Sequence, residues 1–222
     1  KQVYRVPFER NSERVKDLRH QYVQCLNWII LKGYEWIFVD ESPGQRGGNI
    51  TLCAAISNHG VLSAHATLGP YNTEHLLTFL YGLRNASVDR EQQNHQHEVQ
   101  PVYVVVWDYV SFHRGVQIRQ WFNNNQQFIN VILPPYSPFL NPIEEFFSAW
   151  RWKVYDRNPY TRENLLQAME LACGDIDVQS CQGWIHHTRG FFARCLARDN
   201  IACNVDEVLW PDPAQRHDPE EE

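Results

Sequence analysis

The chain has 222 residues, 43% hydrophobic and 21% charged, which is typical of one substantial globular domain. No apolar run approaches the roughly 18 residues of a membrane-spanning helix. The composition therefore excludes transmembrane, collagen-like and fully disordered classes, and we expect no membrane partner. The net charge is −6, of which the stretch from Asp212 to Glu222 carries −4, so the near-neutral body neither supports nor excludes a nucleic-acid substrate. Six scattered cysteines without C-x-x-C spacing indicate reduced thiols rather than a disulfide framework.

Apolar spacing, helix caps and Gly/Pro breaks predict the order of the elements along the chain. The first half comprises an extended arm over residues 1–10, a helix from Asn11 or Ser12 to Gly33, a strand Trp36–Val39, a loop 41–48, a hairpin of Ile50–Ser57 and Val61–Leu68, a helix from Asn72 or Thr73 through Leu83, and a mobile polar loop Ser87–Gln100. The second half comprises a strand Val102–Trp107, a helix Gly115–Asn123, a strand Phe128–Leu133, a loop Pro134–Pro142, and helices Ile143–Tyr155, Arg162–Gly174 and Val178–Leu196. This order predicts an α/β fold with a mixed five-stranded sheet flanked by helices, and with helices at both ends of the chain.

Two acids follow apolar strands directly, Asp40 after Trp-Ile-Phe-Val and Asp108 after Val-Val-Val-Trp. If the two strands are neighbours, both carboxylates project from one edge of the sheet, where ligand sites of such sheets gather. A single strand-end Asp is also a common way to start a turn. The pair is therefore a candidate site only in combination with further residues.

A third acid, Glu144, lies at the start of a predicted helix after a proline-rich approach, Pro134-Pro-Tyr-Ser-Pro-Phe-Leu-Asn-Pro-Ile-Glu. With Asn141 as the N-cap and Pro142 at the first position, Glu144 falls at the third position and completes a capping-box arrangement. Capping alone does not explain three prolines before the helix. Rigid placement matters if Glu144 must meet Asp40 and Asp108.

Three converging carboxylates repel one another unless cations lie between them. Hard divalent ions take oxygen ligands, and two such ions activate the attacking oxygen and stabilise the leaving one in phosphodiester displacement. The acids therefore indicate metal-assisted phosphoryl transfer on nucleic acid.

The motifs Phe38-Val-Asp-Glu-Ser, Trp107-Asp followed by His113, and Pro-Tyr-Ser-Pro-x-Leu-Asn-Pro-Ile-Glu resemble the catalytic domain of mariner-superfamily DDE transposases, in the branch with bacterial insertion-sequence relatives. The 35 residues between Asp108 and Glu144 match the short second spacing of that superfamily. The resemblance covers about residues 35–157. Two positions depart from the pattern: Tyr109 stands where the family often has Asn, and Phe139 where it often has Asp.

The resemblance implies an RNase H-like fold that uses two Mg²⁺ or Mn²⁺ ions to cleave and transfer DNA strands during cut-and-paste transposition. It implies that Asp40, Asp108 and Glu144 are the catalytic, metal-binding triad. Asn141 and Glu145 are possible supporting residues, although Glu145 points about 100° away from Glu144 on a helix. For His113 three roles stay open: it orients a carboxylate, contacts DNA, or caps the following helix.

The expected partners are transposon-end DNA, target DNA and a second copy of the chain, because the family acts as a dimer on DNA. Phosphate contacts are predicted for a basic group after Glu144, although a charged solvent face is the alternative. This group consists of Arg151, Lys153, Arg157 and Arg162, and a second basic cluster consists of Arg10, Arg14, Lys16 and Arg19.

The predicted organisation is a linker and helix over residues 1–34, the catalytic domain over 35–205 and an acidic, disordered tail over 206–222. Because the chain starts at Lys1, we expect a piece of a longer protein whose DNA-end-reading modules precede it. The alternative to an active transposase domain is a domesticated one, kept as a DNA-binding or protein-interaction scaffold. A general nuclease on the same fold is disfavoured by the Asn-Pro-Ile-Glu motif. The substrate implies a nuclear location in a eukaryote and the cytoplasm or nucleoid in a bacterium.

Overall fold

A computed structural model describes residues 8–43, 50–94, 101–108, 115–159 and 161–201. Five strands form one mixed sheet in the order β3-β2-β1-β4-β5, as predicted. Their bounds are β1 Glu35–Pro43, β2 Ile50–Ser57, β3 Gly60–Leu68, β4 Tyr103–Trp107 and β5 Phe128–Ile132. The first three strands pair antiparallel, and β1, β4 and β5 run parallel. The predicted hairpin is confirmed, and it turns at Gly60, whose φ of +98° suits a residue without a Cβ.

The strand expected to end at Val39 is longer than predicted, because β1 continues to Pro43. Its parallel pairing with β4 ends at Phe38, whereas its antiparallel pairing with β2 continues through Pro43. The sequence after Asp40 looked like a loop because Glu, Ser and Pro are poor strand formers. Backbone pairing with β2 overrides that local preference.

Helices account for most of the rest of the described chain. Their bounds are α1 Glu13–Leu31, α2 Thr73–Asn94, α3 Val116–Asn124, α4 Ile143–Asp156, α5 Arg162–Gly174, α6 Val178–Arg189 and α7 Phe192–Leu196. Short 3₁₀ turns cover Phe8–Asn11 and Pro138–Leu140. The arm expected to be extended over residues 1–10 is wrong at its C-terminal end, because Phe8–Asn11 form a 3₁₀ turn that leads directly into α1. Ser12 caps that helix, and its side chain accepts a hydrogen bond from the N–H of Val15.

Two further predictions about helices are wrong. The stretch from Ser87 to Asn94 continues α2 instead of forming a loop, because Ser87 is buried and its hydroxyl donates to the carbonyl of Leu83. The single helix expected over Val178–Leu196 is broken at Gly190. At that residue the backbone N–H bonds back to the His187 carbonyl, and a Cβ would lie only 3.1 Å from the same oxygen.

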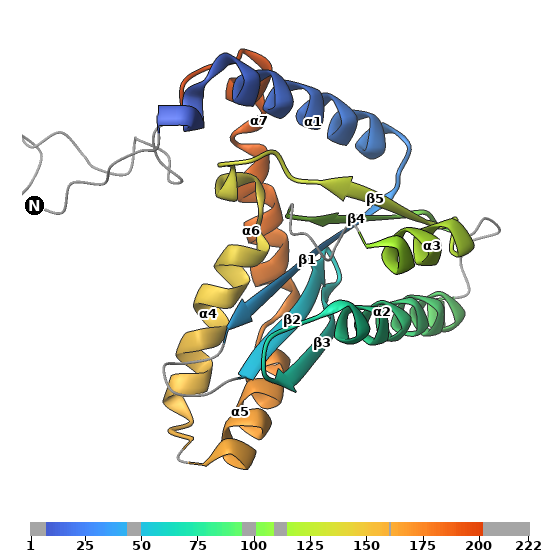
Figure 1. The fold of residues 1–222 in the computed structure, drawn as a ribbon, viewed down its shortest axis with the longest axis vertical. Helices are drawn as coiled ribbons and strands as arrows, with labels where there is room; N and C mark the ends of the chain where they lie inside the picture. The colour runs from blue at the N-terminus through green and yellow to red at the C-terminus, as the bar shows by residue number, and fades with distance from the viewer. Residues whose placement is uncertain (1–7, 44–49, 95–100, 109–114, 160, 202–222) are drawn as a thin grey trace, which may run out of the picture.

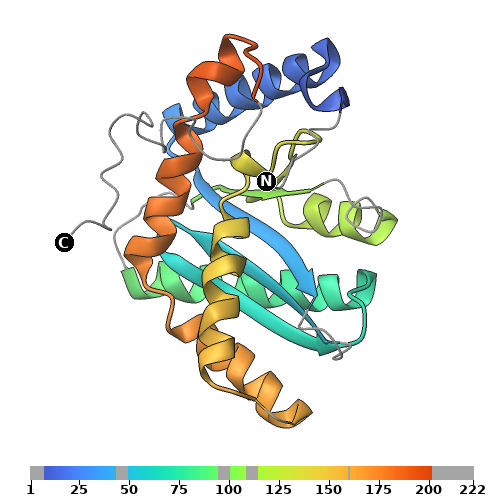
Figure 2. The same cartoon turned by 90° about the vertical axis from the view of Figure 1, so that its left-hand side faces the viewer.

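The sheet is covered on both faces, which makes three layers (Figures 1 and 2). One core cluster joins the sheet to α1, α4, α5, α6 and α7, and the other joins it to α2 and α3. Figure 2 shows α4 and α6 in front of the sheet and α2 behind it. β4 lies inside the sheet and all five of its residues are buried, as its continuous apolar run predicts.

The cysteines of the described ranges are free thiols, in line with the absence of a disulfide pattern in the sequence. Four of the five are buried and Cys25 is exposed. Within the described ranges no helix is both long and apolar enough to cross a membrane.

Candidate active site

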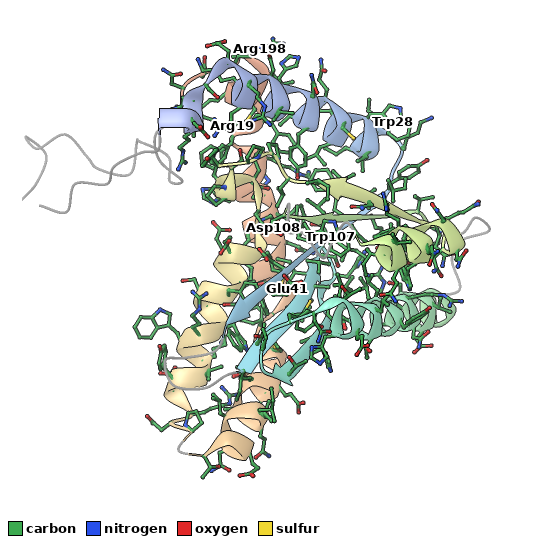
Figure 3. The ribbon with its side chains drawn as sticks, viewed as in Figure 1. Arg19, Trp28, Glu41, Trp107, Asp108 and Arg198 are labelled. Atoms are coloured by element: carbon green, nitrogen blue, oxygen red, sulfur yellow. The ribbon has the colours of Figure 1, made fainter. Side chains whose placement is uncertain are left out.

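Neighbouring strands bring Asp40 and Asp108 to one place in the sheet. The last matched pair of β1 and β4 is Phe38 with Val106, and each acid lies two residues further along its strand direction. Because side chains alternate along a strand, Asp40 leaves the sheet on the same face as Phe38, and Asp108 on the same face as Val106. That face is covered by α4, and Figure 3 shows Asp108 at the end of β4 that points toward α4.

The segment between β5 and α4 places the third acid, Glu144. It begins with Pro134 and Pro135, contains Tyr136 at a φ of +54°, and tightens into the 3₁₀ turn Pro138–Leu140 before α4 starts. Proline fixes φ, so this segment has few alternative conformations. Glu144 is therefore held at the first turn of α4, opposite the ends of β1 and β4.

The three acids line one pocket of about 250 Å³, together with Asn141 and the proline-rich segment. Asp40 is the buried member, with 9% of its surface exposed, whereas Glu144 is exposed at the rim. The structure thus brings together the three residues that the sequence predicted as a triad.

Asn141 does not cap α4 as predicted. The residue preceding the helix is Pro142, no side chain caps the first turn, and the amide of Asn141 donates instead to Oδ2 of Asp40 over 2.9 Å. The charge of the carboxylate strengthens this hydrogen bond. The bond does not occupy Oδ1, the atom that would accept from the backbone in a cap. Asn141 therefore contacts Asp40 within the pocket, and its buried Oδ1 has no hydrogen-bond partner among the described residues.

Both oxygens of Asp40 are held by hydrogen bonds, since the backbone N–H of Glu41 donates to Oδ1 over 2.8 Å. Burial, and next the charge of Asp108, raise the pKa of Asp40 to about 7. Partial burial also raises the pKa of the Glu144 carboxyl, an effect that Arg151 opposes and Asp108 reinforces. The pocket thus concentrates negative charge that is costly to hold without a cation.

The donors of the pocket suit a hard divalent cation, because they are carboxylate oxygens and the unpartnered amide oxygen of Asn141. As the side chains lie, however, no group of three His, Cys, Asp or Glu residues in the described ranges is gathered closely enough to hold a metal ion. The chemistry of the donor set therefore fits such an ion, and ligation requires the carboxylates to draw together within the pocket.

The other predicted residues have different surroundings. Glu145 points away from the pocket, as expected from the helix geometry, and its carboxylate bonds to Nδ1 of His187 on α6 over 2.6 Å. Arg151 lies about two turns beyond Glu144 on α4, and it donates to the hydroxyl of Ser42 over 2.8 Å. Arg157 pairs with Asp175, which leaves it less suited to bind phosphate.

Several predictions fall outside what the structure describes. His113 and Tyr109 lie outside the described residues, as do residues 95–100 of the expected polar loop and the acidic tail. Arg162 begins α5, but its side chain is not among those described. Phe139, the second departure from the family pattern, is buried and packs against Phe191.

Arg19, one member of the second basic cluster, is not available to a DNA phosphate because it is buried. Arg19 is 1% exposed and its guanidinium donates to Ser137 Oγ and to the Tyr136 carbonyl, both over 2.8 Å. Figure 3 shows it on α1, on the side facing the segment before α4. The available signal was its position in the helical apolar stripe of α1, between Val15 and Tyr22.

The model of the DDE superfamily of endonucleases matches residues 31–166, more than half of the chain. The chain belongs to the DDE superfamily of endonucleases. This confirms the family expected from the motifs. No curated protein matches the sequence.

Solved structures support the fold of this DDE endonuclease domain. The catalytic domain of Mos1 mariner transposase matches with a TM-score of 0.71 at 16% identity, over 90% of this chain and 100% of that one. The Mos1 catalytic domain with Raltegravir and Mn matches with a TM-score of 0.71 at 17% identity, over 88% and 96%. The Mos1 paired-end complex with Mn matches with a TM-score of 0.71 at 17% identity, over 89% of this chain and 66% of that one. The predicted RNase H-like fold is thereby confirmed.

Proposed function

We propose that this DDE domain is the catalytic domain of a cut-and-paste DNA transposase, with Asp40, Asp108 and Glu144 as its catalytic residues. The observation that carries the proposal is their shared pocket, in which Asp40 is coupled electrostatically to both other acids. Such a pocket is unlike a structural ion-pair cluster, because the coupled groups all carry the same sign of charge. The substrate is DNA, cleaved at an element's ends and joined to a target.

Two divalent ions, Mg²⁺ or Mn²⁺, would be held by Asp40, Asp108 and Glu144. When bound, they supply an activated attacking oxygen and stabilise the leaving oxygen of a phosphodiester. Mos1 catalytic-domain structures contain Mn or Mg, which supports the same preference here. The buried amide oxygen of Asn141 is a further neutral donor at the same place.

The residues of this chain prepare the pocket for that chemistry. The amide of Asn141 and the N–H of Glu41 fix the rotation of the Asp40 carboxyl. Arg151 favours the ionised form of Glu144, as a metal ligand requires. The rigid approach to α4 holds Glu144 in place, which preserves the geometry that such reactions depend on.

The proposed partners are transposon-end DNA and target DNA, bound by a homodimer. Mos1 structures of a paired-end complex and of a strand-transfer complex support this assignment by analogy of fold. Phosphate contacts from Arg151 and Lys153 belong to the same proposal. So does a nuclear location in a eukaryote, or a cytoplasmic one in a bacterium.

The experiment is a thermal-shift titration with Mn²⁺ and Mg²⁺ on the parent chain and on Asp108→Asn, Glu144→Gln and Glu145→Gln. An ion that binds only the folded state adds about 2.7 kcal/mol at a hundredfold excess over Kd. We expect the parent and Glu145→Gln to gain stability and the other two variants to lose most of that gain. Glu145→Gln is the matched control, because Glu145 is the next residue of α4 but bonds to His187.

Nicking of DNA that carries the element's ends then tests the reaction itself, with the same four chains. Metal-dependent strand cleavage by the parent and by Glu145→Gln, but not by the other two, supports the transposase assignment. If metal stabilises none of the chains even with DNA present, the triad does not bind metal, and the domesticated scaffold becomes the better description.

A further inference from the structure

An aromatic pair on α4 is exposed to solvent. The side chain of Trp152 is 68% exposed and that of Tyr155 48%, and their rings lie side by side with centroids 6.0 Å apart. The other aromatic residues of α4 are buried in the core: Phe146, Phe147 and Trp150. Exposure of two adjacent large rings on a helix that otherwise buries its aromatics marks a contact surface.

The pair follows the candidate active site along the same helix. With a rise of about 1.5 Å and a turn of about 100° per residue, Tyr155 lies about 16 Å beyond Glu144 and within about 20° of its direction. Trp152 lies about 12 Å beyond Glu144. A strand that leaves the pocket along α4 therefore meets the aromatic pair within a few nucleotides, at most about five if its bases stay stacked at ~3.4 Å each.

Two cations flank Trp152, whereas the exposed acid Asp156 follows Tyr155, so the charge that favours a polyanion lies at the Trp152 end of the pair. Arg151 lies on the Glu144 side of the rings, is exposed and is anchored on Ser42 by a 2.8 Å hydrogen bond. Lys153 is the residue after Trp152. A nucleic-acid strand combines phosphates, which pair with such cations, with flat bases, which stack on exposed rings.

We propose that Trp152 and Tyr155 form a stacking platform for unpaired bases of the DNA strand that enters the acid pocket. Stacking needs an exposed ring, and both residues are exposed. It works with any base because every base presents a π-face. The inference rests on the proposed function for the direction of the strand. It adds that the preferred ligand has single-stranded character near the reacting phosphate.

The test measures fluorescence anisotropy of a labelled single-stranded (dT)16 and of a blunt duplex of equal length, with a chelator present. We expect Trp152→Ala and Tyr155→Ala to weaken single-strand binding by about 5- to 150-fold, the range for loss of one stacked base. Blunt-duplex binding, which offers no unpaired base, is expected to change less than twofold. Trp152→Phe is expected to retain most of the single-strand affinity because it keeps a ring.

Trp28→Ala is the matched control. Trp28 is 50% exposed, packs edge-on against Tyr34 with centroids 5.7 Å apart, and has Lys32 over its ring, but it lies at the far end of α1 (Figure 3). We expect Trp28→Ala to bind both DNAs as the parent does. Circular dichroism melting of each variant, expected to match the parent because these rings are exposed, accounts for any loss of fold.

The platform is overturned if the parent does not prefer the single strand, if Trp152→Ala and Tyr155→Ala bind it like the parent, or if Trp28→Ala loses as much affinity. The metal titration of the parent chain, carried out without a chelator and without DNA, separates this result from the proposed function. Single-strand binding is measured with a chelator present, so neither measurement depends on the other. A platform without metal binding, or metal binding without a platform, is then recognised directly.

Discussion

A single buried carboxyl, that of Asp40, links the stability of this domain to its proposed chemistry. Its pKa is raised to about 7 from the ordinary 3.8, first by burial and then by Asp108. The folded chain therefore holds a proton on Asp40 more tightly than the unfolded chain does. This protonation stabilises the fold fully below about pH 4, and the stabilisation is lost as the pH rises through about 7.

We predict that Asp40→Asn changes the pH dependence of stability. As the pH rises from 5 to 8, the parent loses the stability that the protonated Asp40 provides, and the variant does not. The free energy of unfolding of the variant minus that of the parent should therefore increase over this range by up to roughly 3 kcal/mol. Urea unfolding at a series of pH values, with a chelator present, measures the difference. Equal pH profiles for the two chains would mean that Asp40 titrates normally in the fold.

At the scale of elements, α1 and the segment before α4 are tied together by Arg19. Its guanidinium bonds to neutral oxygens of Ser137, Tyr136 and Asn11 and lies 5.1 Å from the ring centre of Phe139. Burial lowers the pKa of Arg19 to about 10. Neutral oxygens offset the desolvation of a buried cation less than an opposite charge would. We therefore expect the main effect of Arg19 to be that it fixes the segment that carries Asn141 and Glu144.

We predict that Arg19→Met lowers the free energy of unfolding by about 2–4 kcal/mol, because it leaves buried oxygens of the segment without a donor. The free energy of unfolding of Arg19→Lys should fall between those of the parent and of Arg19→Met. One ammonium cannot serve both Ser137 and Tyr136 in the fork geometry of arginine. Guanidinium denaturation provides the measurement. The control is Arg14→Met, an exposed residue of the same helix, which should change stability by less than about 0.5 kcal/mol.

At the scale of the whole molecule, α1 is part of the same core as the catalytic sheet. Its buried apolar side chains are Val15, Tyr22, Val23, Leu26 and Ile29, of which the last four belong to the core cluster that includes the sheet. The helix also packs against α7. Further hydrogen bonds join the two ends of the described chain, from Arg10 to the Ile201 carbonyl and from the Ile201 N–H to Asn11.

We predict that a chain starting at residue 35, the expected start of the catalytic domain, does not fold cooperatively. Five apolar side chains at about 1.5–3 kcal/mol each contribute roughly 8–15 kcal/mol, which equals the whole stability of a typical domain. Urea unfolding of the shortened chain, monitored by near-UV circular dichroism, tests this prediction. A sigmoidal transition in the shortened chain would show instead that residues 1–34 are a separable linker and helix.

Local patterns in the sequence determined much of this architecture. Short-range signals predicted six elements to within a few residues of their bounds. These signals are the continuous apolar run of β4, the hairpin of β2 and β3, and the helical spacing of α1, α4 and α5. The two strand-borne acids and the Pro-Tyr-Ser-Pro approach to Glu144 were equally visible. Such features are encoded by neighbouring residues, so a linear reading recovers them.

Only the tertiary structure decided which partner each polar group takes. Asn141 looked like a helix cap but bonds to Asp40, 101 positions away in sequence. Arg19 was predicted as a member of a basic cluster but is buried against Ser137, and Glu41 continues a strand because β2 pairs with it. Each depends on a group brought near by folding, whose hydrogen bond outweighs a local preference worth about 1 kcal/mol or less.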